Sequence, residues 1–199
     1  MTFADRLIQN RFSACFASLL PALLLAACSS GSGYTNLASS ATEIPQSQGV
    51  VVIGVQGDAQ ATFRPGVLAN DGSFEHESRA AEFRSADSEP YIVQALEQTT
   101  TTLRYGMFSA SLGGKRYEFE CGQVLPVLSV QPGAAQYYGD FEVLVDGGKL
   151  KVKQSFDIER AQQFIDSNYP DSGWKLLPGK LDRARSTECL TVPPAAIVS

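Results

Sequence analysis

The sequence predicts a mainly β protein, an antiparallel β-sandwich with one short C-terminal helix. Three features favour this class: short β-branched runs, glycine pairs that mark hairpins, and a single amphipathic segment late in the chain. Strands that alternate apolar and polar residues between such turns are typical of sandwiches. We expect seven or eight short strands.

The first half of the predicted domain contains two strands and an ambiguous segment. Val50 to Val55 is β-branched and predicts a buried strand, and Tyr91 to Leu96 predicts another. Arg64-Pro65-Gly66 and Asn70-Asp71-Gly72 have the composition of turns. Ser73 to Arg84 lacks a clear period and is compatible with a short helix.

Gly147-Gly148 predicts a two-residue hairpin turn whose flanking strands have a defined register. One face of this hairpin is aliphatic and the other carries opposite charges, so a slip of one residue would destroy both patterns. The expected cross-strand pairs are Asp146 with Lys149, Val145 with Leu150, Leu144 with Lys151, Val143 with Val152, and Glu142 with Lys153.

A similar hairpin is expected around Gly113-Gly114, with Phe108 opposite Phe119 and Ala110 opposite Tyr117. Alternation then places Cys121 on the inward side. Gln123 to Val130 predicts another strand, which Pro126 confines to an edge or a bulge. Pro132-Gly133 turns the chain into a strand over Ala135 to Phe141.

The one predicted helix begins after Asp157, a suitable N-cap, and ends near Asn168, because Pro170 disfavours helical geometry before it. At about ten residues it is too short to be stable alone, so its apolar stripe must pack on the sheet. Trp174, Leu176 and Leu177 predict a last strand or clasp. The stripe comprises Ile158, Ala161, Phe164 and Ile165.

Residues 1–27 have the features of an export signal: a positive start, an apolar stretch and small residues at the end. Leu25-Ala26-Ala27-Cys28 resembles a lipobox, the processing site of bacterial lipoproteins. The resemblance implies cleavage between Ala27 and Cys28 and acylation of Cys28, which anchors the protein to a membrane. The alternative is an ordinary secreted protein. Ser29 matches the residue type that permits transport to the outer membrane, which implies a periplasm-facing position there.

After the signal, residues 28–48 predict a lipidated flexible tether, 49–190 a single β-sandwich domain, and 191–199 a loose tail. The net charge of the whole chain is −5. Removing Asp5, Arg6 and Arg11 with the signal leaves 14 basic and 20 acidic residues. This acidic balance without basic clusters argues against nucleic acid as a partner.

Cys121 and Cys189 are the two thiols left once Cys15 departs and Cys28 carries lipid. In an oxidising envelope they are expected to form one disulfide, closing a loop of about 70 residues with roughly 4 kcal/mol of stabilisation. The alternative is two free buried thiols.

The sequence contains few features of a catalytic or metal-binding site. The single histidine, His76, lies in Phe74-Glu75-His76-Glu77 and is expected as a surface residue, because a metal site needs three or four converging ligands. No cofactor or metal is expected. Two acid pairs, Glu118 with Glu120 and Asp140 with Glu142, are the remaining candidates for hydrolysis of glycans or peptides.

Aromatic residues offer a binding hypothesis, although core packing is their commoner use. Tyr138, beside Gly139, and Trp174 are the candidate binding surface, and an exposed sheet edge near Pro126 or Tyr91 offers strand addition. Gln131-Pro132-Gly133 and Tyr137-Tyr138-Gly139-Asp140 resemble segments of uncharacterised envelope lipoproteins with prealbumin-like sandwiches, a resemblance that covers residues 49–178.

The sequence thus favours a lipid-anchored, non-enzymatic interaction or structural module at the cell envelope, with an unknown protein or cell-wall partner. The alternatives are an envelope enzyme that uses acidic residues on glycan or peptide, and a ligand carrier with an apolar cavity.

Overall fold

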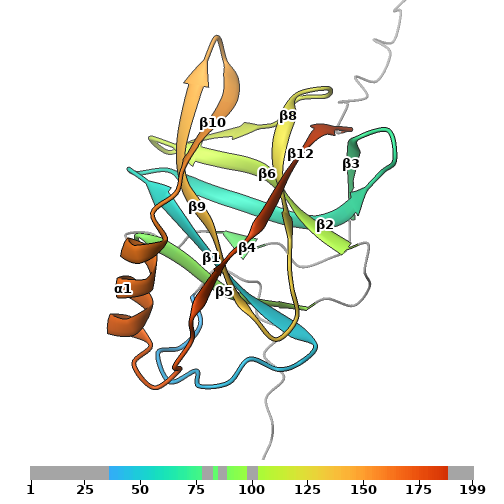
Figure 1. Cartoon of the computed structure of the whole chain (residues 1–199). Coiled ribbons are helices and arrows are strands. Elements are labelled where there is room, and N and C mark those ends of the chain that lie inside the picture. Colours follow the sequence, from blue (N-terminus) through green and yellow to red (C-terminus); the bar gives the residue numbers. More distant parts are fainter. Residues whose placement is uncertain (1–35, 78–82, 85–88, 98–102, 188–199) are drawn as a thin grey trace, which may run out of the picture. The chain divides into compact units, whose positions relative to one another are not determined.

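The computed structural model describes residues 36–77, 83–84, 89–97 and 103–187, all within the compact unit Gly31–Ser199. This part is mainly β with one helix, as the sequence predicts (Figure 1). Its elements are β1 (Gln48–Gln56), β2 (Gln60–Leu68), β3 (Ser73–His76), β4 (Phe83–Arg84), β5 (Tyr91–Glu97), β6 (Leu103–Leu112), β7 (Lys115–Glu118), β8 (Val124–Ser129), β9 (Ala135–Asp146), β10 (Lys149–Ser155), α1 (Ile158–Asn168), β11 (Leu176–Pro178) and β12 (Lys180–Ser186).

The strands form two sheets. The smaller has the order β10-β9-β1-β5, with β11 beside β9. The larger has the order β4-β2-β3-β12-β8-β6-β7, and β2 also pairs with β6. That extra pairing closes β2, β3, β12, β8 and β6 into a five-strand barrel, so the predicted antiparallel β-sandwich is not confirmed.

Two glycines inside the larger sheet accompany its closure. The ring of Phe74 is fully buried and lies against the backbones of Gly66 and Gly106, where an added Cβ would lie 2.8 and 2.4 Å from ring atoms. The composition of Arg64-Pro65-Gly66 predicts a turn, but these residues are part of β2. In the segment Ser73 to Arg84, which the sequence leaves ambiguous, the described residues include strands β3 and β4, and residues 78–82 lie outside the described residues.

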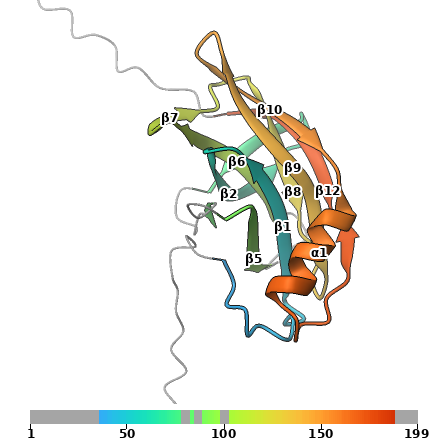
Figure 2. The ribbon, with the colours of Figure 1, turned by 90° about the vertical axis from the view of Figure 1, so that its left-hand side faces the viewer.

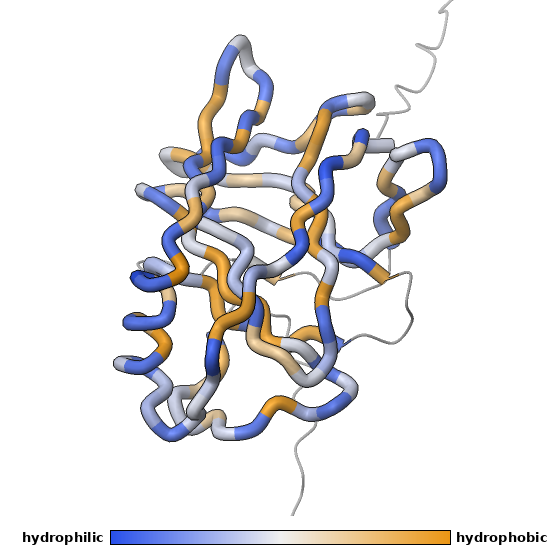
Figure 3. Tube along the Cα trace, viewed as in Figure 1, coloured by the Kyte–Doolittle hydropathy of each residue, from blue (hydrophilic) through white to orange (hydrophobic). Residues whose placement is uncertain are grey.

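The smaller sheet is buried on both faces. Val50 and Val52 of β1 belong to one apolar cluster that includes Ala161 and Ile165 of α1. Val51 and Ile53 belong to a second cluster, shared with the larger sheet. Figure 2 shows α1 beside β1 and β9, and Figure 3 shows apolar and polar residues alternating along α1. The β-branched run reads as continuously apolar because each face has its own core.

Both predicted hairpin registers are confirmed, including all five cross-strand pairs around Gly147-Gly148. The helix is also confirmed, with the Asp157 side chain accepting from the Arg160 backbone N–H. The described residues form twelve strands instead of the expected seven or eight, and the sequence did not predict β12. Around Pro126, β8 pairs only with β12, so the residue lies at a local edge of an otherwise internal strand.

Part of the predicted tether packs on the domain. Leu37, Ala41 and Ile44 contact the apolar cluster on the helix side of the smaller sheet. The Leu37 N–H donates to the Val93 carbonyl at 2.8 Å, and the Asn36 side chain bonds to the backbones of Tyr91 and Val93. This segment covers the edge of β5 near Tyr91 that the sequence offered for strand addition. Residues 28–35 and the tail 191–199 lie outside the described residues.

We predict that Gly106→Ala lowers the free energy of unfolding by about 1–3 kcal/mol, because its methyl group would overlap the Phe74 ring. Replacing the Phe74 ring by leucine should relieve the overlap. The loss of stability in the Gly106→Ala, Phe74→Leu double variant should therefore be smaller than the sum of the two single losses by at least about 0.5 kcal/mol. Urea denaturation of both single variants and the double variant measures this coupling. Strict additivity would contradict the barrel packing.

Candidate functional site

An extra residue in β9 turns two polar side chains toward α1. The register of β9 against β1 runs from Tyr137 opposite Val52 to Asp140 opposite Gly54, three residues against two. Gly139 lies in this bulge with φ +101, where a side chain would be strained and would also meet the Ser155 carbonyl at 2.7 Å. The bulge reverses the alternation of the strand, so Tyr137 and Asp140 lie on the same face.

Asp140 is a buried carboxylate paired with an arginine of the helix. Its side chain is 3% exposed, and its Oδ2 accepts from Nη2 of Arg160 at 2.5 Å. The Arg160 Nε–H donates to the hydroxyl of Tyr91 at 3.1 Å. Gly54 provides the space, because a Cβ there would lie 1.8 Å from Asp140 Oδ1. The pair thus depends on β1, β5, β9 and α1 together.

The electrostatics of this group favour the ion pair. Hydrogen bonds to Asp140 and Tyr91 raise the pKa of Arg160 above its ordinary value. Burial raises the pKa of Tyr137, and its hydrogen bond to Asp140 raises it further. Burial also raises the pKa of Tyr91, with the Asp140 charge acting in the same direction. Both tyrosines therefore stay protonated around the carboxylate.

A hollow of about 290 Å³ opens beside this ion pair. The Arg160 side chain is 55% exposed, so its guanidinium reaches from the buried carboxylate to solvent. A buried ion pair is weak evidence for stability, whereas perturbed groups in a hollow are typical of functional sites. We therefore take this hollow as the candidate site. It is lined by Val55, Gln56, Gly57, Pro90, Tyr91, Asp140 and Arg160.

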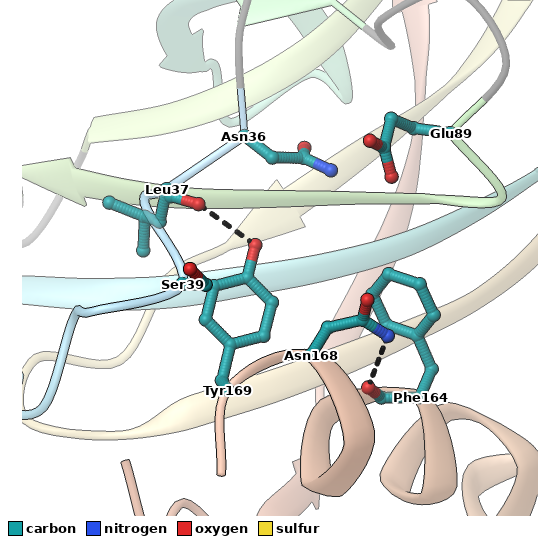
Figure 4. Close-up of a pocket in the computed structure, with 7 residues that line it drawn as sticks. All are labelled: Asn36, Leu37, Ser39, Glu89, Phe164, Asn168 and Tyr169. Carbon is teal, nitrogen blue, oxygen red and sulfur yellow. Dashed lines mark hydrogen bonds between the residues drawn. The ribbon is translucent and has the colours of Figure 1, made fainter. Parts of the chain in front are cut away.

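A second hollow, of about 340 Å³, lies where the N-terminal segment meets the end of α1 (Figure 4). Two of its wall residues are fixed by backbone acceptors: the Tyr169 hydroxyl donates to the Leu37 carbonyl at 3.0 Å, and the Asn168 amide donates to the Phe164 carbonyl at 2.9 Å. Asn36, Ser39 and Glu89 complete its lining. A third, of about 470 Å³, lies near Gly57, Leu112 and Glu142.

The other acids proposed from the sequence lie beside cations. Glu118 accepts from Arg116 at 3.0 Å, Glu142 lies 3.6 Å from Lys153, and Glu120 lies 3.9 Å from Lys149. These side chains are about half exposed, as solvated strand faces usually are. Asp140 and Glu142 share a face as expected, but only Asp140 is buried.

The candidate binding surface proposed from the sequence is wrong for both residues. Tyr138 is fully buried, and its hydroxyl donates to the Ser129 carbonyl at 2.7 Å. Trp174 is 7% exposed and stacks on Tyr169 with ring centroids 5.5 Å apart. Each lies inward because the fold packs on both faces of the smaller sheet.

His76 is not the surface loop residue that the sequence predicts. It lies in β3, with its ring edge-on to the rings of Phe74 and Phe108 at centroid distances of 4.8 and 5.3 Å. Both ring nitrogens are buried, and neither has a hydrogen-bond partner among the described residues. Burial and the Arg64 charge lower its pKa to about 4. Among the described residues, no group of three or more His, Cys, Asp or Glu side chains could hold a metal ion.

Cys121 is disulfide-bonded, but it lies exposed in the turn after β7, where the alternation that predicted an inward position has ended. The Gly122 N–H donates to the Ser186 carbonyl at 2.8 Å, which brings the end of β12 beside this turn. Cys189, Ala27 and Cys28 lie outside the described residues, so the Cys121–Cys189 pairing and the anchor stay predictions.

Sequence reasoning missed Arg160 as a site residue. The available signal was Gly139 inside a strand pattern, which often marks a bulge. Comparisons with family models, with curated proteins and with solved structures found no match. Within the described ranges, no helix has the length and apolar character needed to cross a membrane.

We predict that Arg160→Met lowers the free energy of unfolding by about 2–4 kcal/mol, because it leaves the Asp140 carboxylate buried without a cation. The matched control is Lys153→Met, which breaks an exposed pair with Glu142 and should cost less than about 1 kcal/mol. Chemical denaturation at neutral pH compares the two variants. Equal losses would show that the Asp140 pair is as weakly coupled as a surface one.

A second prediction concerns the pH dependence of stability. The pKa of His76 is about 4 when folded and about 6.5 when unfolded, so the unfolded state binds more protons between these values. The stability contribution of neutral His76 is complete above pH 6.5 and is lost as the pH falls toward 4. The unfolding free energy of the wild type should therefore fall more steeply over this range than that of His76→Leu.

Because this is the only histidine, the difference between the two proteins isolates its titration from that of the carboxylates. Denaturation curves collected from pH 4 to 8 provide the measurement. Parallel stability profiles would show that the imidazole is solvated in the folded protein.

Proposed function

We propose that this protein is a lipid-anchored lipoprotein of the cell envelope that acts as a non-enzymatic binding module, held at the periplasmic side of the outer membrane. The lipobox resemblance of Leu25-Ala26-Ala27-Cys28 supports the anchor, and Ser29 supports the choice of membrane. An unknown envelope protein or cell-wall component is the partner.

The observation that carries the binding role is the Asp140–Arg160 ion pair that lines the 290 Å³ hollow. The bulge in β9, the absence of a side chain at Gly54 and the first turn of α1 together position this ion pair. An arginine fixed by a carboxylate and a tyrosine presents its remaining N–H donors in one orientation, which is suited to recognition. Asp140 already accepts from Arg160, so the pair orients a donor rather than acting as a free base.

The competing proposal is hydrolysis by paired acids. That chemistry needs two carboxylates on either side of a bound bond, one of them protonated. Glu118, Glu120 and Glu142 each lie beside a cation instead, which is Arg116, Lys149 and Lys153 respectively. These contacts support the binding role over the hydrolytic one.

The test is photo-cross-linking in living cells, with a photoreactive residue at Gln56 in the hollow of the full-length protein. We expect a dominant cross-linked envelope component, and its yield should fall when Cys28→Ser removes the anchor. The same variant should keep its signal sequence and fractionate without lipid. The matched control places the photoreactive residue at Lys149 in β10, away from the hollow.

Processed, lipid-bearing Cys28→Ser protein would refute the anchor. Equal products from Gln56 and Lys149 would refute the hollow as the binding site. Turnover of a cell-wall or peptide substrate that is abolished by Glu118→Gln or Glu142→Gln would establish the enzyme instead.

A further inference from the structure

The hollow beside Arg160 has the charge balance of a site for uncharged ligands. Asp140 cancels the charge of Arg160 through their direct contact. The charged groups that line the hollow are one carboxylate, Asp140, and one guanidinium, Arg160, so an incoming ion of either sign would meet a like charge.

The donors that remain on Arg160 define what the ligand must accept. A guanidinium carries five N–H groups, of which Nε–H is bonded to Tyr91 and one Nη2–H to Asp140. The side chain is 55% exposed, so the remaining N–H groups are accessible to a ligand. Gln56 adds an amide that both donates and accepts. Hydroxyl groups, which also do both, complement this set.

The size and apolar lining of the hollow limit the ligand further. A volume of about 290 Å³ lies at the lower end of small-molecule sites, which suits one ring rather than an extended chain. Val55 and Pro90 supply apolar surface beside the polar groups. A neutral sugar ring combines hydroxyls at its rim with C–H groups on its faces.

We infer that the hollow binds an uncharged, hydroxyl-bearing ligand of about one sugar ring, with Arg160 donating to its oxygens. This inference rests on the proposed function and names the ligand class of the same site. A saccharide unit of the cell wall has this chemistry. Asp140 is then a positioning residue that fixes the guanidinium, and Tyr91 fixes its other side.

Three matched sugars separate the charge classes: N-acetylglucosamine is neutral, glucuronate is an anion and glucosamine is a cation at neutral pH. The full-length protein in detergent is titrated with each while NMR follows the Arg160 Nε–H and Gly57 backbone N–H signals. We expect N-acetylglucosamine to shift both signals in a saturable way. The two charged sugars should bind at least tenfold more weakly.

Arg160→Lys keeps the positive charge beside Asp140 but loses the planar fork, so it should weaken N-acetylglucosamine binding about tenfold. Gln56→Ala is a second variant that leaves the ion pair intact and should also weaken binding. Lys153→Met is the control and should leave the affinity unchanged. Thermal unfolding of each variant confirms that it is folded.

No saturable shift with N-acetylglucosamine, equal or tighter binding of glucuronate, or unchanged affinity in folded Arg160→Lys would each overturn the inference. If N-acetylglucosamine fails while Gln56 still cross-links an anchored partner in cells, the ligand class is wrong and the binding role stands. If both fail, the proposed binding role fails as well.

Discussion

The single extra residue at Gly139 of β9 is the constraint on which the candidate site and the packing depend. Before the bulge, Tyr138 lies in the core shared with the larger sheet, and after it Phe141 and Val143 do. Without the change of phase, Asp140 would point into that core, where an unpaired carboxylate is very costly to bury. Only glycine adopts φ +101 at this point readily, and the Ser155 carbonyl leaves no room for a side chain. The bulge at Gly139 therefore keeps the Asp140 carboxylate out of the core and places it beside Arg160.

The helix and the N-terminal segment stabilise each other through the smaller sheet. An eleven-residue helix is marginal in isolation, so its buried side, Ala161 and Ile165, must pack on β1 and β9. Tyr169 follows the helix and donates to the Leu37 carbonyl, while the Leu37 N–H pairs with Val93 at the β5 edge. This edge is thereby covered by the chain itself, which is one way proteins prevent unwanted strand pairing. The opposite edge, β10, is protected differently, by the exposed lysines Lys149, Lys151 and Lys153.

Much of the fold was predictable from local periodicity. The features that depend on long-range packing were not. The Gly147-Gly148 hairpin was predictable residue by residue, because aliphatic and opposite-charge pairs specify one register. The helix was predictable because Asp157 and Pro170 mark its ends. Arg64-Pro65-Gly66 has the composition of a turn, and the Glu75 carbonyl and the Phe74 ring, which come later in the chain, show why residue 66 is glycine. Likewise, Arg160 and Asp140 are twenty residues apart on different elements, and no spacing rule connects them.

The packing of residues 36–47 on the domain also bears on the proposed anchor. Under that proposal, only residues 29–35 separate the lipidated Cys28 from Asn36, which bonds to β5. Eight residue steps span at most about 28 Å, so the β5 edge would remain within that distance of the lipid. Tyr91 lies on this same strand and holds Arg160 from one side. The anchor would then do more than localise the protein: it would keep the Arg160 hollow close to the membrane surface and confine the partner to the same layer of the envelope. A cell-wall saccharide within reach of the membrane satisfies this geometric condition, whereas a component confined far from the membrane does not.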